Sequence, residues 1–233
     1  MKSVSILGDS ISTFEGCNPH GYAVFYDKEM QKINGLETMY DTWWAKVIQA
    51  LHARLCINNS YSGSRVTGIK FPAAVSDERM NNLGTPDNKP NAILIYIGFN
   101  DFGNGVRVRR CGIDLLGEKD LLVFEDAYDS MLRTMNRKYP NSKIVCGTLM
   151  RTRIQGRENW AFPEAFGGIE LEEYNEVIRS TVKKNHCYLA DIGMQDIRYE
   201  TYDGSHPNVD GHQTIANAWI KCMSDLKLIE SSM

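Results

Sequence analysis

Short apolar runs rich in β-branched side chains recur along this 233-residue chain, and they constrain its fold more than any other feature. Runs that are apolar on both faces are typical of parallel strands covered by helices on both sides. We therefore expect each run to form a buried strand of a parallel sheet. The runs are Val4–Leu7, Leu55–Asn58, Ile93–Ile97, Lys143–Cys146 and Cys187–Ile192.

Helix-like segments alternate with these runs. In the first segment the apolar residues between Trp43 and Leu51 recur at steps of three and four, the spacing of one buried helical stripe. This alternation of strand and helix predicts a doubly wound α/β fold, in which ligands bind outside the carboxyl ends of the strands. The segments are Thr42–Arg54, Glu118–Tyr139, Glu170–Asn185 and Asp210–Lys227.

Three long connections follow strands or the loops that extend them: Ile11–Asp41, Gly68–Pro90 and Arg151–Gly168. Loops longer than about 12 to 15 residues are usually functional or contain small elements of their own. We expect these connections to crowd the carboxyl-end face of the sheet. No linker or repeat interrupts the chain, so we expect one domain over residues 1–233.

The charge balance argues against two classes of partner. The formal net charge is −3 and no dense run of lysine and arginine occurs, so neither nucleic acid nor a membrane is expected as a partner. The N-terminus is too short for a signal peptide, and no apolar stretch approaches the roughly 18 residues that span a bilayer. We therefore expect a cytoplasmic protein. The six cysteines stand singly, without metal-site spacing, and are expected to be reduced.

A serine follows the first apolar run, in the stretch Gly8-Asp9-Ser10. A strand that ends in glycine would present Ser10 at the ligand-binding face of the sheet. Serine and aspartate are also preferred helix caps, and that role alone explains the local pattern at least as well. The stretch is neither the Gly-x-Ser-x-Gly elbow of α/β-hydrolases nor a P-loop, which would carry a lysine.

Asp203 and His206 stand close together before the last helix-like segment. At three residues apart in a turn, the carboxylate can reach the Nδ1–H of the imidazole. That bond would fix the tautomer and leave Nε2 free to accept a proton from a serine. The alternative is a turn and cap ahead of a helix, with His206 merely packed.

Two other strand ends carry candidate donors for a developing oxyanion. Gly63, after the second run, lets a backbone N–H approach a ligand closely, and Asn100, after the third, offers a neutral side-chain amide. Glycine and asparagine are also ordinary turn residues, so neither position is decisive alone.

Taken together, these short stretches resemble blocks I, II, III and V of the SGNH (GDSL-type) hydrolase superfamily. They occur in the order of that family and cover almost the whole chain. The resemblance implies a three-layer α/β/α sandwich around a flavodoxin-like, five-stranded parallel sheet. The matching stretches are Gly8-Asp9-Ser10, Gly63, Gly98-Phe99-Asn100-Asp101 and Asp203-x-x-His206.

The resemblance also implies the roles of the site residues. Ser10 would be the nucleophile, His206 the base and Asp203 its orienter. The oxyanion hole would consist of the backbone N–H groups of Ser10 and Gly63 and the side-chain amide of Asn100. Acyl transfer would pass through an acyl-Ser10 intermediate, with no cofactor and no metal.

We expect no catalytic role for three other polar residues in or near these motifs. We interpret Asp9 and Asp101 as hydrogen-bonding scaffolds of the loops, because the base already has a carboxylate partner. His212 is interpreted as a residue of the first helical turn and not as a second base.

Only the residues of the long loops indicate which ester the enzyme would bind. Trp160 is expected at the site or at a subunit contact, and Arg151 directly follows the fourth run, where it could meet a polar or anionic group. Aromatic side chains in the first connection, such as Phe25, and at the start of the helix-like segment after it, Trp43 and Trp44, could line a pocket or form core.

We expect a small-molecule ester with a short, acetyl-like acyl group, on a carbohydrate. A thioesterase or lysophospholipase with the same triad is the alternative among enzymes, and a non-catalytic binding module the alternative outside them. Exposed aromatic loops would also suit a homo-oligomer.

Overall fold

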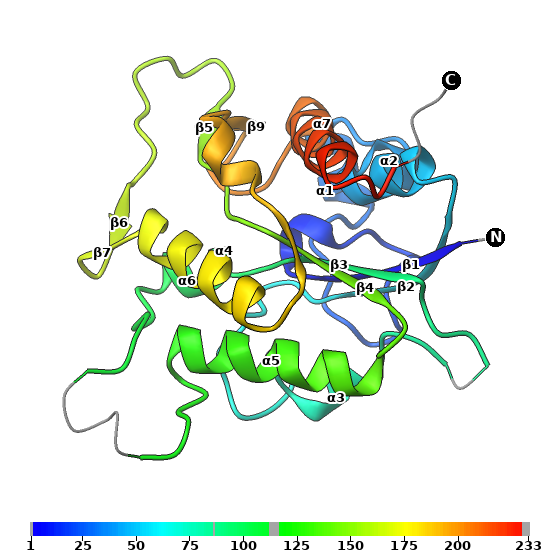
Figure 1. The fold of residues 1–233 in the computed structure, drawn as a ribbon. Coiled ribbons are helices and arrows are strands. Elements are labelled where there is room, and N and C mark those ends of the chain that lie inside the picture. The colour runs from blue at the N-terminus through cyan, green and yellow to red at the C-terminus, as the bar shows by residue number, and fades with distance from the viewer. Residues whose placement is uncertain (1, 86, 112–116, 230–233) are drawn as a thin grey trace.

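A five-stranded parallel sheet forms the centre of the computed structural model, which describes residues 2–85, 87–111 and 117–229 (Figure 1). Its strand order is β2-β1-β3-β4-β8, and every neighbouring pair is parallel. The five predicted strands and their parallel arrangement are therefore confirmed. The strands are β1 (Ser3–Gly8), β2 (Arg54–Ser60), β3 (Ala92–Tyr96), β4 (Lys143–Gly147) and β8 (Tyr188–Ala190).

Helices cover both faces of this sheet, which gives the expected α/β/α sandwich (Figure 1). Helices α2 and α7 pack together on one face with α1 beside them, and α5 and α6 pack together on the other face with α3. These helices are α1 (Lys28–Asn34), α2 (Trp43–Ala50), α3 (Asp77–Asn81), α5 (Phe124–Lys138), α6 (Leu171–Lys184) and α7 (Val209–Asp225).

Tryptophans lock the α2–α7 layer onto the sheet. The rings of Trp43 and Trp219 stack with centroids 5.1 Å apart, and both side chains are fully buried, as is Trp44. A Cβ on Gly147 of β4 would come within 2.5 Å of the Trp219 ring, so only glycine allows the indole this close to the sheet. Trp43 and Trp44 thus belong to the core and do not line a pocket.

Two helices are shorter in the structure than the segments predicted for them. Helix α2 stops at Ala50, before Arg54, because His52 adopts a left-handed conformation with φ of 50° that turns the chain toward β2. Helix α5 starts at Phe124 and not at Glu118. The Asp120 carboxylate accepts a hydrogen bond from the Leu122 backbone, a local turn that competes with helix formation.

The third long connection contains small elements of its own. Its strand β5 (Thr152–Ile154) pairs in parallel with β9 (Tyr199–Thr201), and β6 (Ala165–Phe166) pairs with β7 (Ile169–Glu170) as an antiparallel hairpin. Short helices complete the carboxyl-end side: η1 (Ser10–Ser12), η2 (Met39–Asp41), α4 (Phe99–Gly103) and η4 (Ile192–Gln195).

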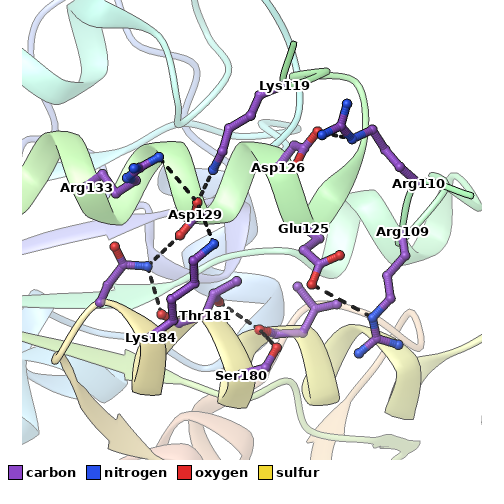
Figure 2. Close-up of polar contacts among 12 residues, drawn as sticks. Arg109, Arg110, Lys119, Glu125, Asp126, Asp129, Arg133, Ser180, Thr181 and Lys184 are labelled. Atoms are coloured by element: carbon purple, nitrogen blue, oxygen red, sulfur yellow. Dashed lines mark hydrogen bonds and ion pairs between the residues drawn. The ribbon is translucent and has the colours of Figure 1, made fainter. Parts of the chain in front are cut away.

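A buried carboxylate joins α5, α6 and the segment before α5 (Figure 2). Asp129 of α5 accepts hydrogen bonds from Lys119, from Lys184 at 3.2 Å and from Asn185 at 2.7 Å. The Asp129 side chain is almost inaccessible, whereas Lys184 and Arg133, 3.9 Å away, reach solvent. Because the cations meet the carboxylate from three segments, the cluster stabilises this layer, on the opposite face of the sheet from α2 and α7.

No helix among the described residues is long and apolar enough to cross a membrane. The six cysteines all lie in described segments, and none of them is in a disulfide.

Candidate active site

Ser10 lies immediately beyond the carboxyl end of β1, as the first residue of η1. The turn is fixed by Asp9, whose Oδ1 accepts a hydrogen bond from the Ile11 N–H at 3.0 Å. A Cβ on Gly8 would lie 2.6 Å from the Ser12 hydroxyl, so the sharp turn from strand to helix requires glycine. The serine that could have been a simple helix cap is therefore held at the strand end with its side chain free for another partner.

That partner is His206, and Asp203 lies behind it. The His206 Nε2 is 2.9 Å from the Ser10 hydroxyl, and its Nδ1 is 2.6 Å from Asp203 Oδ2. The second carboxylate oxygen of Asp203 accepts the backbone N–H groups of Ser205 and His206, both at 2.8 Å. With Nδ1–H donated to Asp203, Nε2 must accept from the Ser10 hydroxyl, which is the arrangement of a nucleophile and its base.

The Asp203 carboxylate is held in its charged form. Partial burial acts to raise its pKa, but the hydrogen bonds and charge of His206 and the backbone N–H groups outweigh it and lower the pKa below the ordinary value. Asp203 is thus an anion at neutral pH, ready to stabilise an imidazolium.

Phe25, from the first long connection, stacks on the His206 ring. The two ring centroids are 3.4 Å apart and the planes are only 10° from parallel. An aromatic face in this position fixes the imidazole plane and attracts its protonated form. The sequence showed Phe25 only as one of several aromatic residues in a loop, because nothing in the local pattern links it to His206.

Phe25→Leu should lower kcat by about three- to tenfold while KM changes little, since a stacked ring contributes about 0.5–1.5 kcal/mol. Steady-state kinetics with p-nitrophenyl acetate measure this, and Phe25→Tyr, which keeps the ring, is the matched control. Equal kcat values for the leucine variant and the unmodified enzyme would show that the stack does not act on the base.

Gly63 and Asn100 are brought together by one hydrogen bond. Gly63 lies in the turn after β2 with φ of 78°, and the turn closes through a bond from Ser64 N–H to the Tyr61 carbonyl at 3.1 Å. The Asn100 amide, at the start of α4, donates to the Ser64 carbonyl at 3.0 Å. One N–H of this amide is used in that bond, and among the described residues no hydrogen-bond acceptor takes the other.

Arg79, which the sequence did not single out, ties the same loops together from beneath. Its guanidinium is fully buried and donates to the Gly8 carbonyl at 2.9 Å, to both oxygens of Asn59 and to the Ser64 hydroxyl at 2.9 Å. A fifth bond reaches the Pro72 carbonyl. A buried arginine is rare unless every donor is satisfied, so the strand ends carrying Ser10 and Gly63 are rigidly connected.

The two motif aspartates hold loops. Asp101 accepts from the backbone of Val66 and Thr67 and from the Thr67 hydroxyl, and burial nevertheless raises its pKa to about 6. Asp9 has one oxygen bonded to Ile11, while the other is buried and has no hydrogen-bond partner among the described residues. Burial raises its pKa to about 7.

Asp9 should therefore make the fold less stable as the pH rises from about 4 to about 7. Over this interval the folded state binds the proton that the unfolded state has released, so the stability falls by up to about 1.4 kcal/mol per pH unit. Asp9→Asn should remove this loss. Melting temperatures of both proteins across the interval test it, and parallel curves would contradict the prediction.

His212 lies in the first turn of α7, fully buried. Its Nδ1 accepts the Trp43 backbone N–H at 3.2 Å, and burial, with the charges of Lys46 and His206, lowers its pKa to about 3. It is a neutral packed residue that joins α7 to α2.

A cleft of about 380 Å³, here called the site cleft, opens beside these residues. Asn100 and residues 203–205 line it together with Trp160 and Phe162. The Trp160 ring lies 3.1 Å from where a Cβ of Gly204 would be, against the peptide between Asp203 and His206. Arg151 is not among the described residues lining the cleft, and its guanidinium is paired with Glu164 at 2.8 Å.

Residues 2–164, which make up more than half of the chain, match the model of the GDSL-like lipase/acylhydrolase family. The chain belongs to this family. The matched range contains Ser10, Gly63 and Asn100, and the fold brings Asp203 and His206 to them from outside it.

Relatives of this GDSL-type hydrolase agree with that assignment. Over 94% of its length the chain is 22% identical to an acetylxylan esterase from Geobacillus stearothermophilus, of which 93% is covered. A structure described as a GDSL-like lipase from Bacteroides ovatus is 27% identical with a TM-score of 0.72, and 97% of this chain and 99% of that one are covered. A second, from Bacteroides uniformis, has the same identity and TM-score, with 96% of each chain covered. The chain is a serine ester hydrolase of the SGNH superfamily.

In the described parts of this hydrolase, no three His, Cys, Asp or Glu side chains gather where they could hold a metal ion.

Proposed function

We propose that this hydrolase removes a short acyl group, an acetyl group above all, from an esterified carbohydrate, with Ser10 as nucleophile. The observation that carries the catalytic part of the proposal is the continuous chain of hydrogen bonds from Ser10 through His206 to Asp203. The acetyl group and the carbohydrate are supported by the likeness to an acetylxylan esterase and by the aromatic site cleft.

The first half of the reaction forms an acyl-enzyme. The Ser10 oxygen attacks the ester carbonyl while its proton passes to His206 Nε2, and Asp203 stabilises the imidazolium. The negative oxygen of the tetrahedral intermediate accepts hydrogen bonds from the N–H groups of Ser10 and Gly63 and from the Asn100 amide. When the intermediate collapses, the C–O bond to the alcohol breaks and the alcohol takes the proton from His206.

The second half restores the serine. A water molecule gives a proton to His206 and attacks the acyl carbonyl, and the same donors hold the second oxyanion. The bond to Ser10 then breaks, the serine recovers its proton from His206, and the acid leaves. Because the two halves use the same groups in reverse roles, one rigid site serves both.

The site cleft suits a sugar on the alcohol side of the ester. His206 must lie next to the departing alcohol, and the Trp160 ring packs on Gly204, two residues before it. An indole face beside a polar site is a common platform for a sugar ring.

The test compares kcat/KM for acetylated xylooligosaccharides, p-nitrophenyl esters of increasing chain length, acetyl-CoA and a lysolipid. We expect the acetyl oligosaccharide to exceed p-nitrophenyl acetate through a lower KM, and activity to fall as the acyl chain lengthens. Faster turnover of acetyl-CoA or of the lysolipid would contradict the proposed substrate and leave the serine chemistry intact.

A further inference from the structure

A second cleft is also lined by Trp160. It has a volume of about 450 Å³ and is lined by residues 153–158, Trp160, Arg198 and Glu200, and we call it the outer cleft. Trp160 lines both the outer cleft and the site cleft. The indole of Trp160 is therefore the contact through which a ligand in the site cleft can reach the outer cleft.

The small sheet of β5 and β9 forms the wall of the outer cleft. Arg153 of β5 and Glu200 of β9 face each other in register and form an ion pair with Nη2 and Oε1 2.5 Å apart. Arg198 stands directly before β9. The pair between Arg153 and Glu200 neutralises both groups, so the unbalanced charge of the outer cleft comes from the remaining residues.

Besides the pair of Arg153 and Glu200, the lining of the outer cleft contains two arginines and one carboxylate. Arg157 and Arg198 are exposed, and among the described residues neither forms an ion pair, while Glu158 is the other charged residue of the lining. The outer cleft thus carries a positive excess on a chain whose formal net charge is −3. Exposed guanidinium groups beside a hollow are well suited to bind a planar carboxylate through two parallel hydrogen bonds.

One turn connects the arginines of the outer cleft to the residues beside His206. The Trp160 N–H donates to the Arg157 carbonyl at 3.0 Å, so Arg157 and Trp160 belong to the same closed turn. The ring of Trp160 lies on the peptide that links Asp203 to His206. Because His206 protonates the departing alcohol, the part of a substrate nearest this turn is the alcohol and not the acyl group.

We propose that the outer cleft is a binding subsite for a carboxylate on the alcohol part of the ester, supplied by a uronic acid residue of an acetylated oligosaccharide. This inference rests on the proposed carbohydrate esterase activity. The neutral sugar that carries the acetyl group stacks on Trp160, and the uronate next to it binds Arg157 and Arg198.

The experiment compares two acetylated xylooligosaccharides that differ only in one glucuronic acid substituent. The unmodified enzyme should show kcat/KM about tenfold higher for the acidic substrate, with the difference in KM, and the ratio should shrink as salt is raised. In the double variant Arg157→Gln, Arg198→Gln, whose fold is checked by circular dichroism, the ratio should approach one.

Arg137→Gln is the matched control. Arg137 is exposed near the end of α5, just before the chain enters the amino end of β4. It therefore lies at the amino ends of the strands, opposite the carboxyl ends that carry the site. It should leave the ratio unchanged. A ratio near one in the unmodified enzyme, or an unchanged ratio in the double variant, overturns the subsite. If neither oligosaccharide is deacetylated while p-nitrophenyl acetate is, the carbohydrate substrate itself is wrong and the subsite falls with it.

Discussion

Ser10→Ala should lower kcat for p-nitrophenyl acetate by about 10⁴-fold or more, and His206→Ala should do the same. The reason is the 2.9 Å bond between them, since a hydroxyl without its base and a base without its hydroxyl are equally inactive. The double variant should be no slower than either single variant, because residues that act as a unit have strongly non-additive effects. Steady-state rates of the three proteins give the result.

Covalent labelling provides the independent readout for this prediction. A small fluorophosphonate should add once to the intact protein, with peptide mapping placing the adduct on Ser10, and Ser10→Ala should take up none. Asp203→Asn should still be labelled, but slowly, since the serine remains and the imidazole is held in the wrong tautomer. A folded protein that takes up no label and does not hydrolyse p-nitrophenyl acetate would restore the interpretation of Ser10 as a helix cap.

The α/β/α layers were predictable because each strand is marked by an apolar run in its own short stretch of sequence. The apolar runs of β1, β3 and β4 are buried almost throughout, and the predicted and observed limits of β1 and β4 differ by one residue at most. The errors occur where a single residue outweighs a pattern. His52 ends α2 through its left-handed backbone before the predicted end at Arg54, and the Asp120 side chain forms a local turn within the range predicted for α5.

The candidate site was predictable only where a motif carries its residues. Ser10, Asn100 and His206 could be selected because each stands at a strand end or before a helix in a recognisable order. Arg79 and Phe25 stand in no such order. Their importance comes from contacts across long sequence separations, with Gly8 for Arg79 and with His206 for Phe25, and only the folded chain creates these contacts.

Substrate residues were the least predictable, as the two candidates show. Trp160 does line the site cleft, whereas Arg151 is occupied by Glu164, thirteen residues away along the chain. Both follow the fourth strand, so their sequence positions could not distinguish them. What separates them is whether a nearby carboxylate satisfies the side chain before a ligand can.

Asn100→Ala should lower kcat by about 10²–10³-fold with little change in KM, the usual cost of one lost oxyanion donor. The free N–H of its amide is the donor in question, because the other is bonded to the Ser64 carbonyl. Asn100→Asp should be at least as slow, since a carboxylate of the same size cannot donate and repels the developing charge. Rates with p-nitrophenyl acetate and melting temperatures are measured together for each variant.

Asn217→Ala is the matched control for Asn100→Ala, because it removes an asparagine side chain that is not an expected oxyanion donor. Asn217 is exposed on α7, and among the described residues its side chain makes one hydrogen bond, which it accepts from Gln213, so kcat should remain at the level of the unmodified enzyme. The Asn100 variants also lose the bond to the turn that carries Gly63, which would appear as a lower melting temperature. If Asn100→Ala keeps its kcat while the protein stays folded, the oxyanion is held by Ser10 and Gly63 alone, and Asn100 serves only to hold that turn.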